Sequence, residues 1–160
     1  MPTAIHDTFC AKVTKEISNQ LEQFQNWAAS VSEFARQIEH FSTSRIILPV
    51  DTEDGEVMYS RREPDASFGH PKARYPGVVI EICYSQKRRD VVRLADDYIL
   101  NTDGSIKAVV CIDIDYKQSK RATLSVWRPE YATVEGKEYF QTTADVDAQV
   151  CFPCKRSHVL

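Results

Sequence analysis

The stretch between Ile5 and Phe41 contains neither glycine nor proline and carries apolar residues three or four positions apart. That spacing is the period of an amphipathic helix. A single helix of this length would extend about 55 Å, which is long for a small domain. Because Ser30 and Glu33 have the spacing of a capping box, we expect a break near Ala29 and two helices that pack on a sheet.

Beyond Ser44 the chain changes to short runs of β-branched and apolar residues separated by turn signals. A helix is predicted over residues 90–100, and strands over residues 45–50, 56–60, 64–68, 78–84, 108–114 and 123–127. A helix that crosses between two apolar strands indicates a βαβ unit. The sequence therefore predicts an α/β fold, with a mixed central sheet, flanking helices and a long helical N-terminus.

The length of 160 residues suits one domain. We divide the chain into an N-terminal helical segment (1–42), an α/β core (43–131) and a C-terminal tail (132–160). The periodicity fades in the tail, so we expect residues 135–160 to be irregular or weakly helical. No apolar run is long enough to span a bilayer, and the first residues carry no signal peptide. We therefore expect an intracellular protein of the cytoplasm or nucleus, without a membrane partner.

The five cysteines are odd in number, which argues against a disulfide framework. Cys83 and Cys111 lie inside apolar strand-like runs, where a buried free thiol is expected. Near the end of the chain, Cys151, Cys154 and His158 have the chemistry of zinc ligands. Since no fourth ligand is evident nearby, unpaired thiols in the tail are the interpretation that we favour.

Glu81 interrupts the otherwise apolar run Val78–Tyr84. A carboxylate in a buried strand is costly unless it is paired or binds a metal. Glu81 therefore either faces solvent, meets an arginine or lines a site. Asp65, which follows Pro64 on the preceding predicted strand, favours a site. Two carboxylates brought together by paired strands suit Mg²⁺ or Mn²⁺.

The segment around these two acids is locally basic, although the formal net charge of the chain is −3. Between residues 61 and 93 it holds four acids and eight basic residues, which are Arg61, Arg62, Lys72, Arg74, Lys87, Arg88, Arg89 and Arg93. Such a segment is either a solvated surface or a surface that faces phosphates around an acidic centre.

A series of short motifs in residues 45–128 resembles the PD-(D/E)XK superfamily, which has the restriction-endonuclease-like fold. The series reads PDASF, EICYS, KRRD, Arg93 with Tyr98, and VVCIDI. It is similar to compact predicted endonucleases of bacteria and to uncharacterised fungal proteins. The resemblance implies that Asp65, Glu81 and the backbone carbonyl of Ile82 bind Mg²⁺ or Mn²⁺.

The chain departs from the family at Cys83, which stands where the family has a lysine that positions or activates the attacking water. Lys87 or Arg93 would then take over that role. A glutamate of the first helix sometimes joins such sites, and here Glu16 and Glu22 are the candidates. Phosphates would be held by Arg61, Arg62, Arg88 and Arg89.

The resemblance thus implies a metal-dependent nuclease that hydrolyses phosphodiester bonds of DNA, or of RNA. The alternative is a catalytically degenerate module on the same fold that binds nucleic acid or protein. Such a module would dimerise or dock a partner through aromatic residues of the N-terminal segment, which are Phe9, Phe24, Trp27, Phe34 and Phe41.

Overall fold

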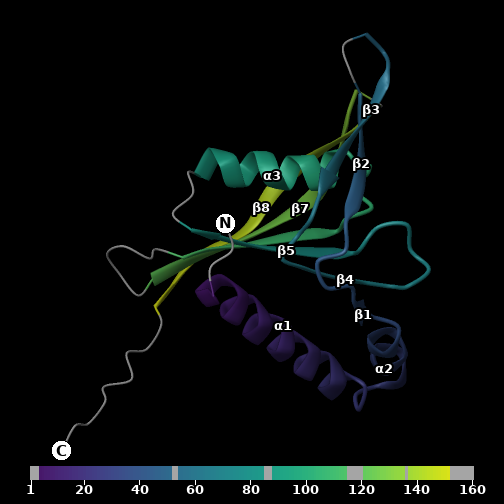
Figure 1. Ribbon diagram of the computed structural model, residues 1–160. Helices are drawn as coiled ribbons and strands as arrows, with labels where there is room; N and C mark the ends of the chain where they lie inside the picture. The colour runs from purple at the N-terminus through teal and green to yellow at the C-terminus, as the bar shows by residue number, and fades with distance from the viewer. Residues whose placement is uncertain (1–3, 52–53, 85–87, 115–120, 136, 152–160) are drawn as a thin grey trace, which may run out of the picture.

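The computed structural model describes residues 4–51, 54–84, 88–114, 121–135 and 137–151 (Figure 1). The helices are α1 (Ala4–Phe24), α2 (Ala29–Arg36) and α3 (Arg88–Leu100). The main sheet has six strands, which in spatial order are β1 (Glu39–His40), β4 (Ala66–Gly69), β5 (Val78–Tyr84), β6 (Ala108–Ile114), β7 (Arg121–Val134) and β8 (Lys137–Cys151). A separate two-stranded sheet pairs β2 (Ile46–Asp51) with β3 (Val57–Arg62).

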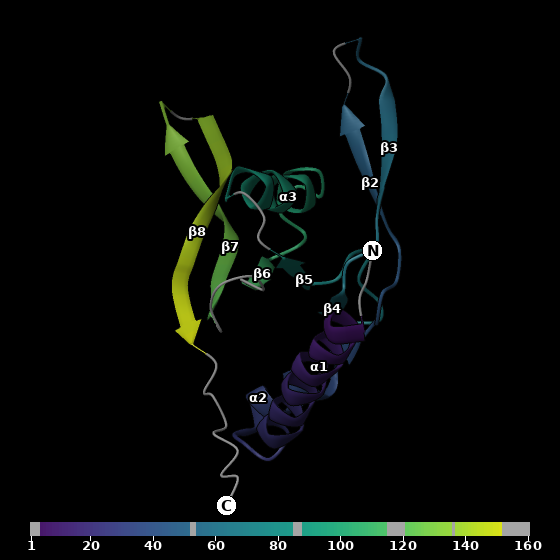
Figure 2. The same cartoon turned by 60° about the vertical axis from the view of Figure 1, so that its left-hand side comes forward.

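The main sheet is mixed, because β5 and β6 pair in parallel while its other neighbouring strands pair antiparallel. The parallel pair is joined through α3, so the predicted βαβ unit and the α/β class are confirmed. Figure 1 shows α3 above the sheet and α1 below it. The β2–β3 hairpin and the far ends of β7 and β8 rise on opposite sides of α3 (Figure 2).

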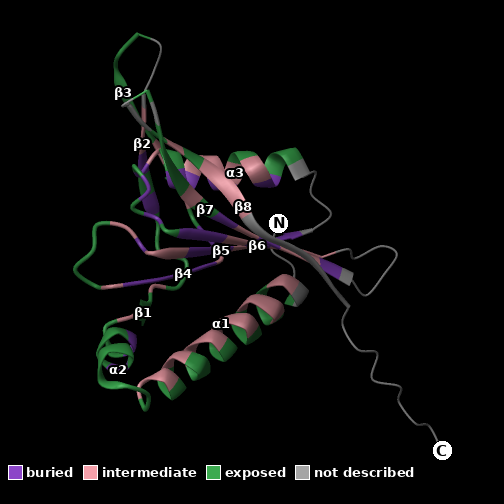
Figure 3. Ribbon diagram, turned by 180° about the vertical axis from the view of Figure 1, so that it is seen from behind, coloured by how far each residue is buried: buried purple, intermediate pink, exposed green. Residues whose placement is uncertain are grey.

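Side-chain alternation along β5 divides the interior into two cores. Val79 faces α3 and packs in a cluster with Tyr98 and Ile99, which also includes residues of β2. The neighbouring Ile80 belongs to a cluster with Phe68, against which α1 packs through apolar residues such as Ile17. Buried residues accordingly gather in the central strands, while α1 alternates between half-buried and exposed positions (Figure 3).

The N-terminal segment breaks where predicted, since α2 begins at Ala29. The predicted capping box is wrong: the residue before the helix is Ala28, and no side chain caps this end. Ser30 lies inside the first turn and is therefore two positions too late to cap it. The prediction that the helical stretch continues to Phe41 is also wrong. Residues 39–40 form β1, which pairs with Phe68 and Gly69 of β4.

The interpretation of the C-terminal tail is wrong for residues 137–151, which form the long strand β8. This strand pairs with β7 along its whole length, with a register shift at Val126 and Trp127. Its tip extends beyond the core, where Tyr131 and Tyr139 are exposed, so no apolar alternation marks it in the sequence. Cys154, His158 and the loop 115–120 lie outside the described residues.

No helix in the described ranges is long and apolar enough to cross a membrane.

Gly69 allows the loop between β4 and β5 to fold tightly against the end of β4. A Cβ atom at this position would lie 2.9 Å from Pro76 Cα and 3.0 Å from the Gly77 backbone nitrogen. We expect Gly69→Ala to lower the free energy of unfolding by about 1–3 kcal/mol, because backbone must move to accept the methyl group. Urea denaturation measures this change.

Gly77→Ala is the matched control, since a Cβ atom there would lie 3.9 Å from its nearest neighbour, the Phe68 carbonyl oxygen. Equal losses in the two variants would contradict the close approach of this loop to Gly69.

Candidate functional site

Asp65 and Glu81 come from adjacent strands of the main sheet. Glu81 lies in β5, and Asp65 immediately precedes β4. Ala66 pairs with Ile80 in the antiparallel register of these strands. Continued by one residue, this register sets Asp65 opposite Glu81. The structure therefore brings the two predicted carboxylates to the same place in the sheet.

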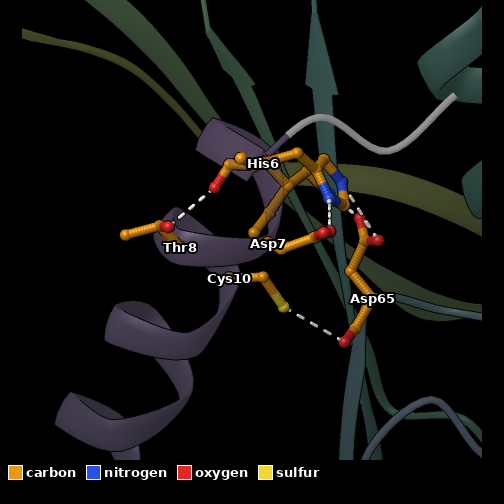
Figure 4. Close-up of polar contacts among 7 residues, drawn as sticks. His6, Asp7, Thr8, Cys10 and Asp65 are labelled. Atoms are coloured by element: carbon orange, nitrogen blue, oxygen red, sulfur yellow. Dashed lines mark hydrogen bonds and ion pairs between the residues drawn. The ribbon is translucent and has the colours of Figure 1, made fainter.

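Three polar contacts fix Asp65 (Figure 4). Its Oδ2 accepts a hydrogen bond from the Ile82 backbone N–H at 2.7 Å. Its Oδ1 lies 3.1 Å from His6 Nε2, and its backbone carbonyl accepts a hydrogen bond from Cys10 Sγ at 3.2 Å. His6 and Cys10 belong to the first turns of α1, so the N-terminal end of this helix lies next to Asp65.

His6 is a residue of the site that the sequence did not reveal. Its imidazole also approaches Asp7, with 3.2 Å between Nδ1 and the carboxylate Oδ1. Burial lowers the pKa of His6, but the hydrogen bond to Asp7, the charge of Asp65 and the Ile82 backbone outweigh it and raise the pKa. Positive charge is thus stabilised beside Asp65 and Ile82, which are two of the three predicted metal ligands.

Glu81 is half-buried on the α3 side of the sheet, and its Oε1 accepts a hydrogen bond from the Tyr98 hydroxyl at 2.6 Å. Burial raises the pKa of Glu81 to about 7, the Tyr98 hydrogen bond opposes the shift, and the charge of Asp65 adds to it. The carboxyl group therefore carries a proton for part of the time near neutral pH. A cation placed beside it would favour the ionised form.

Arg62 stands near Glu81 instead of on an open surface. Its guanidinium pairs with Asp97 of α3, and its charge acts to lower the pKa of Glu81. Its Nε is buried and finds no hydrogen-bond partner among the residues that the structure describes. A buried donor without a partner is uncommon in folded proteins.

Cys83 supplies no positive charge at the position of the family lysine. The side chain is buried, and burial raises the pKa of its thiol to about 12, with the charges of Glu81 and Asp113 adding to the shift. The thiol is therefore neutral at physiological pH. Both Cys83 and Cys111 are free and buried, as the sequence predicted.

The other predicted site residues are exposed, or their side chains or positions fall outside what the structure describes. Arg61 on β3, Arg89 and Arg93 on α3, and Glu16 and Glu22 on α1 are exposed. Arg89 approaches the neighbouring Asp90, with 3.5 Å between Nε and Oδ1. Arg88 begins α3, and Lys87 lies outside the described residues. The positive charges that act on Glu81 come from Arg62 and His6.

The predicted ligands, two carboxylates and a backbone carbonyl, have the chemistry that suits a hard cation such as Mg²⁺ or Mn²⁺. No three His, Cys, Asp or Glu side chains within the described ranges are grouped so as to hold a metal ion. Asp65, Glu81 and the Ile82 backbone carbonyl would offer oxygen atoms to a cation, and Mg²⁺ is commonly bound by one or two carboxylates while it keeps several waters.

Comparisons of the chain with protein-family models, with curated proteins and with solved structures found no match.

Proposed function

We propose that this protein is a divalent-metal-dependent nuclease whose centre is formed by Asp65, Glu81 and the carbonyl of Ile82. The observation that carries the proposal is the strand register that sets Asp65 opposite Glu81. Burial raises the pKa of Glu81 to about 7, and the charge of Asp65 adds to the shift. Two carboxylates that meet on neighbouring strands, one of them with a raised pKa, are typical of a site built to receive a cation.

The order and pairing of the elements support a restriction-endonuclease-like arrangement. Asp65 precedes β4, Glu81 lies in the adjacent β5, α3 follows, and β6 then pairs in parallel with β5. This is the order in which the motifs of the PD-(D/E)XK resemblance occur along the chain. Fold resemblance alone does not establish an activity, so the proposal depends on the chemistry of the site.

Each residue of the site has a distinct role in this proposal. A bound Mg²⁺ or Mn²⁺ supplies polarisation of a phosphoryl oxygen and lowers the pKa of water. His6 orients the Asp65 carboxylate through the contact at 3.1 Å. Arg62 contributes the cation that Cys83 lacks, since its charge already acts on Glu81. Asp97 holds the Arg62 guanidinium in place.

A binding module without cleavage is the second candidate, and the neutral thiol of Cys83 favours it. Exposed aromatic residues on and before α2 would provide its protein contact, since Trp27 is 63% and Phe34 is 65% exposed. The two candidates differ in one measurable property, the breaking of phosphodiester bonds.

Incubation of the protein with labelled DNA and RNA in Mn²⁺ tests the proposal. We expect cleavage of at least one of these substrates, and we expect EDTA to abolish it. Single-stranded and duplex forms of each substrate are compared on denaturing gels. Binding of nucleic acid with no cleavage in Mn²⁺ or Mg²⁺ would contradict the nuclease and support the binding module.

A further inference from the structure

A pocket of about 380 Å³ opens between the β2–β3 hairpin and the loop that joins β4 to β5. Its volume lies within the range of small-molecule sites. Ser67 and Pro76, both buried, line it. Two arginines and two tyrosines also line it, with Arg45 and Tyr59 from the hairpin side and Arg74 and Tyr75 from the loop.

The two arginines give this pocket, which we call the Arg/Tyr pocket, a cationic character. Arg45 donates from Nη2 and Nε to Glu63 Oε1, at 2.7 Å and 2.9 Å, and its side chain is 55% exposed. Arg74 lies over the ring of Tyr75, with 5.1 Å between the guanidinium carbon and the ring centroid. An exposed guanidinium still has donors for a phosphate, which it binds through paired hydrogen bonds.

The tyrosines provide flat apolar surface in the same pocket. Tyr59 is 67% exposed, while Tyr75 is half-buried and packs against the core. Exposed aromatic rings beside cationic side chains are the elements that bind an unpaired nucleobase and its phosphate.

The Arg/Tyr pocket lies close to Asp65 along β4. Ser67, which lines the pocket, is two residues beyond Asp65. Two residues of an extended strand span about 7 Å. A nucleotide in the pocket would therefore lie close to a phosphate held at the carboxylates.

We propose that the Arg/Tyr pocket binds an unpaired nucleotide next to the phosphodiester group that the protein acts on. The base stacks on Tyr59, and a phosphate is held by Arg45 and Arg74. Only an unpaired base can enter, because a base inside a duplex has both of its faces stacked. The position relative to the cleaved bond rests on the proposed nuclease function, whereas the binding of the nucleotide does not.

Fluorescence anisotropy in EDTA tests the binding without cleavage. The probes are a labelled thymidine oligonucleotide, an abasic oligonucleotide with the same number of phosphates, and a duplex of the same length. We expect the thymidine strand to bind about tenfold more tightly than the abasic strand, which is the contribution of stacked bases. Competition by thymidine monophosphate, but not by inorganic phosphate, would show that a nucleotide occupies the pocket.

Variants assign the effect to the pocket. Tyr59→Ala is expected to remove the tenfold preference for bases, and Tyr59→Phe to keep it, because the phenylalanine retains the ring. Tyr139→Ala is the matched control, since Tyr139 is 54% exposed and lies on β8. Arg74→Ala is expected to weaken binding of both single strands about equally, whereas Arg36→Ala on α2 leaves both unchanged.

Equal affinity for the thymidine and abasic strands, or an unchanged preference in Tyr59→Ala, would overturn the proposal. Preferential binding of the duplex would overturn it as well. The nuclease proposal fails separately: base-dependent binding in EDTA without cleavage in Mn²⁺ would leave the Arg/Tyr pocket in place and remove the catalytic centre.

Discussion

Asp65→Asn is expected to slow Mn²⁺-dependent cleavage by about 100-fold or more, because a neutral amide is a much poorer ligand for a hard cation than a carboxylate. The asparagine still accepts the Ile82 N–H hydrogen bond that Asp65 accepts at 2.7 Å, so the fold is expected to persist. Single-turnover cleavage measures the rate, and circular dichroism verifies the fold.

Asp7→Asn is the matched control for this variant. Asp7 and Asp65 contact the same His6 imidazole, at 3.2 Å and 3.1 Å, but only Asp65 is a proposed metal ligand. Asp7→Asn is therefore expected to change the rate far less. If both substitutions slow cleavage equally, the effect acts through His6, and the assignment of Asp65 as a metal ligand is wrong.

Glu81→Gln is expected to raise the free energy of unfolding by about 3 kcal/mol at about pH 8 and to leave it nearly unchanged at about pH 4. The pKa of Glu81 is raised from 4.5 to about 7 in the folded chain. The native state therefore binds more protons than the unfolded state between these values. The contribution of the Glu81 proton to the free energy of unfolding is fully present below pH 4.5. It is lost as the pH rises through 7.

Urea denaturation of both proteins in EDTA across this pH range measures the difference. The glutamine still accepts the hydrogen bond from the Tyr98 hydroxyl, and it never ionises. The stability of Glu81→Gln therefore does not fall with rising pH as that of the wild-type protein does. Glu63→Gln is the control: its side chain is 59% exposed, and a surface pair contributes less than about 1 kcal/mol. A constant difference between wild type and Glu81→Gln at all pH values would show that Glu81 does not titrate near neutrality.

The effect of added Mn²⁺ on the stability of Glu81→Gln tests whether Glu81 binds the metal. A metal that binds only the folded protein stabilises it by mass action. We expect Mn²⁺ to stabilise the wild-type protein at alkaline pH and to have little effect on Glu81→Gln.

The parts of the fold that the sequence predicts are those held by continuous apolar runs. Residues 78–84 and 108–114 are strands in the structure with the predicted bounds, because their alternate faces meet α3 and α1 in two separate cores. Strand β8 escaped prediction because its tip pairs with β7 beyond the core, where backbone hydrogen bonds maintain the strand and side chains need not alternate.

The residues of the candidate site also divide into those that the sequence predicts and those that it does not. Glu81 is visible in the sequence because an acid is conspicuous within an apolar strand. His6 is not visible, since its contact with Asp65 depends on how α1 lies against the sheet. Arg62 was predicted to face phosphates as one of several basic residues, but its pairing with Asp97 requires the packing of β3 against α3. Neither contact has a signature in local spacing.

The two halves of the site belong to different layers, and this gives them separate native-state dynamics. His6 reaches Asp65 from α1, which packs on the sheet through apolar residues such as Ile17, whereas Glu81 accepts a hydrogen bond from Tyr98 of α3. A sub-global opening that releases α1 would uncover Asp65 while the Glu81 side remains folded. Amide hydrogen exchange would then proceed sooner in α1 than in α3, and access to the centre would depend on how often the helix detaches.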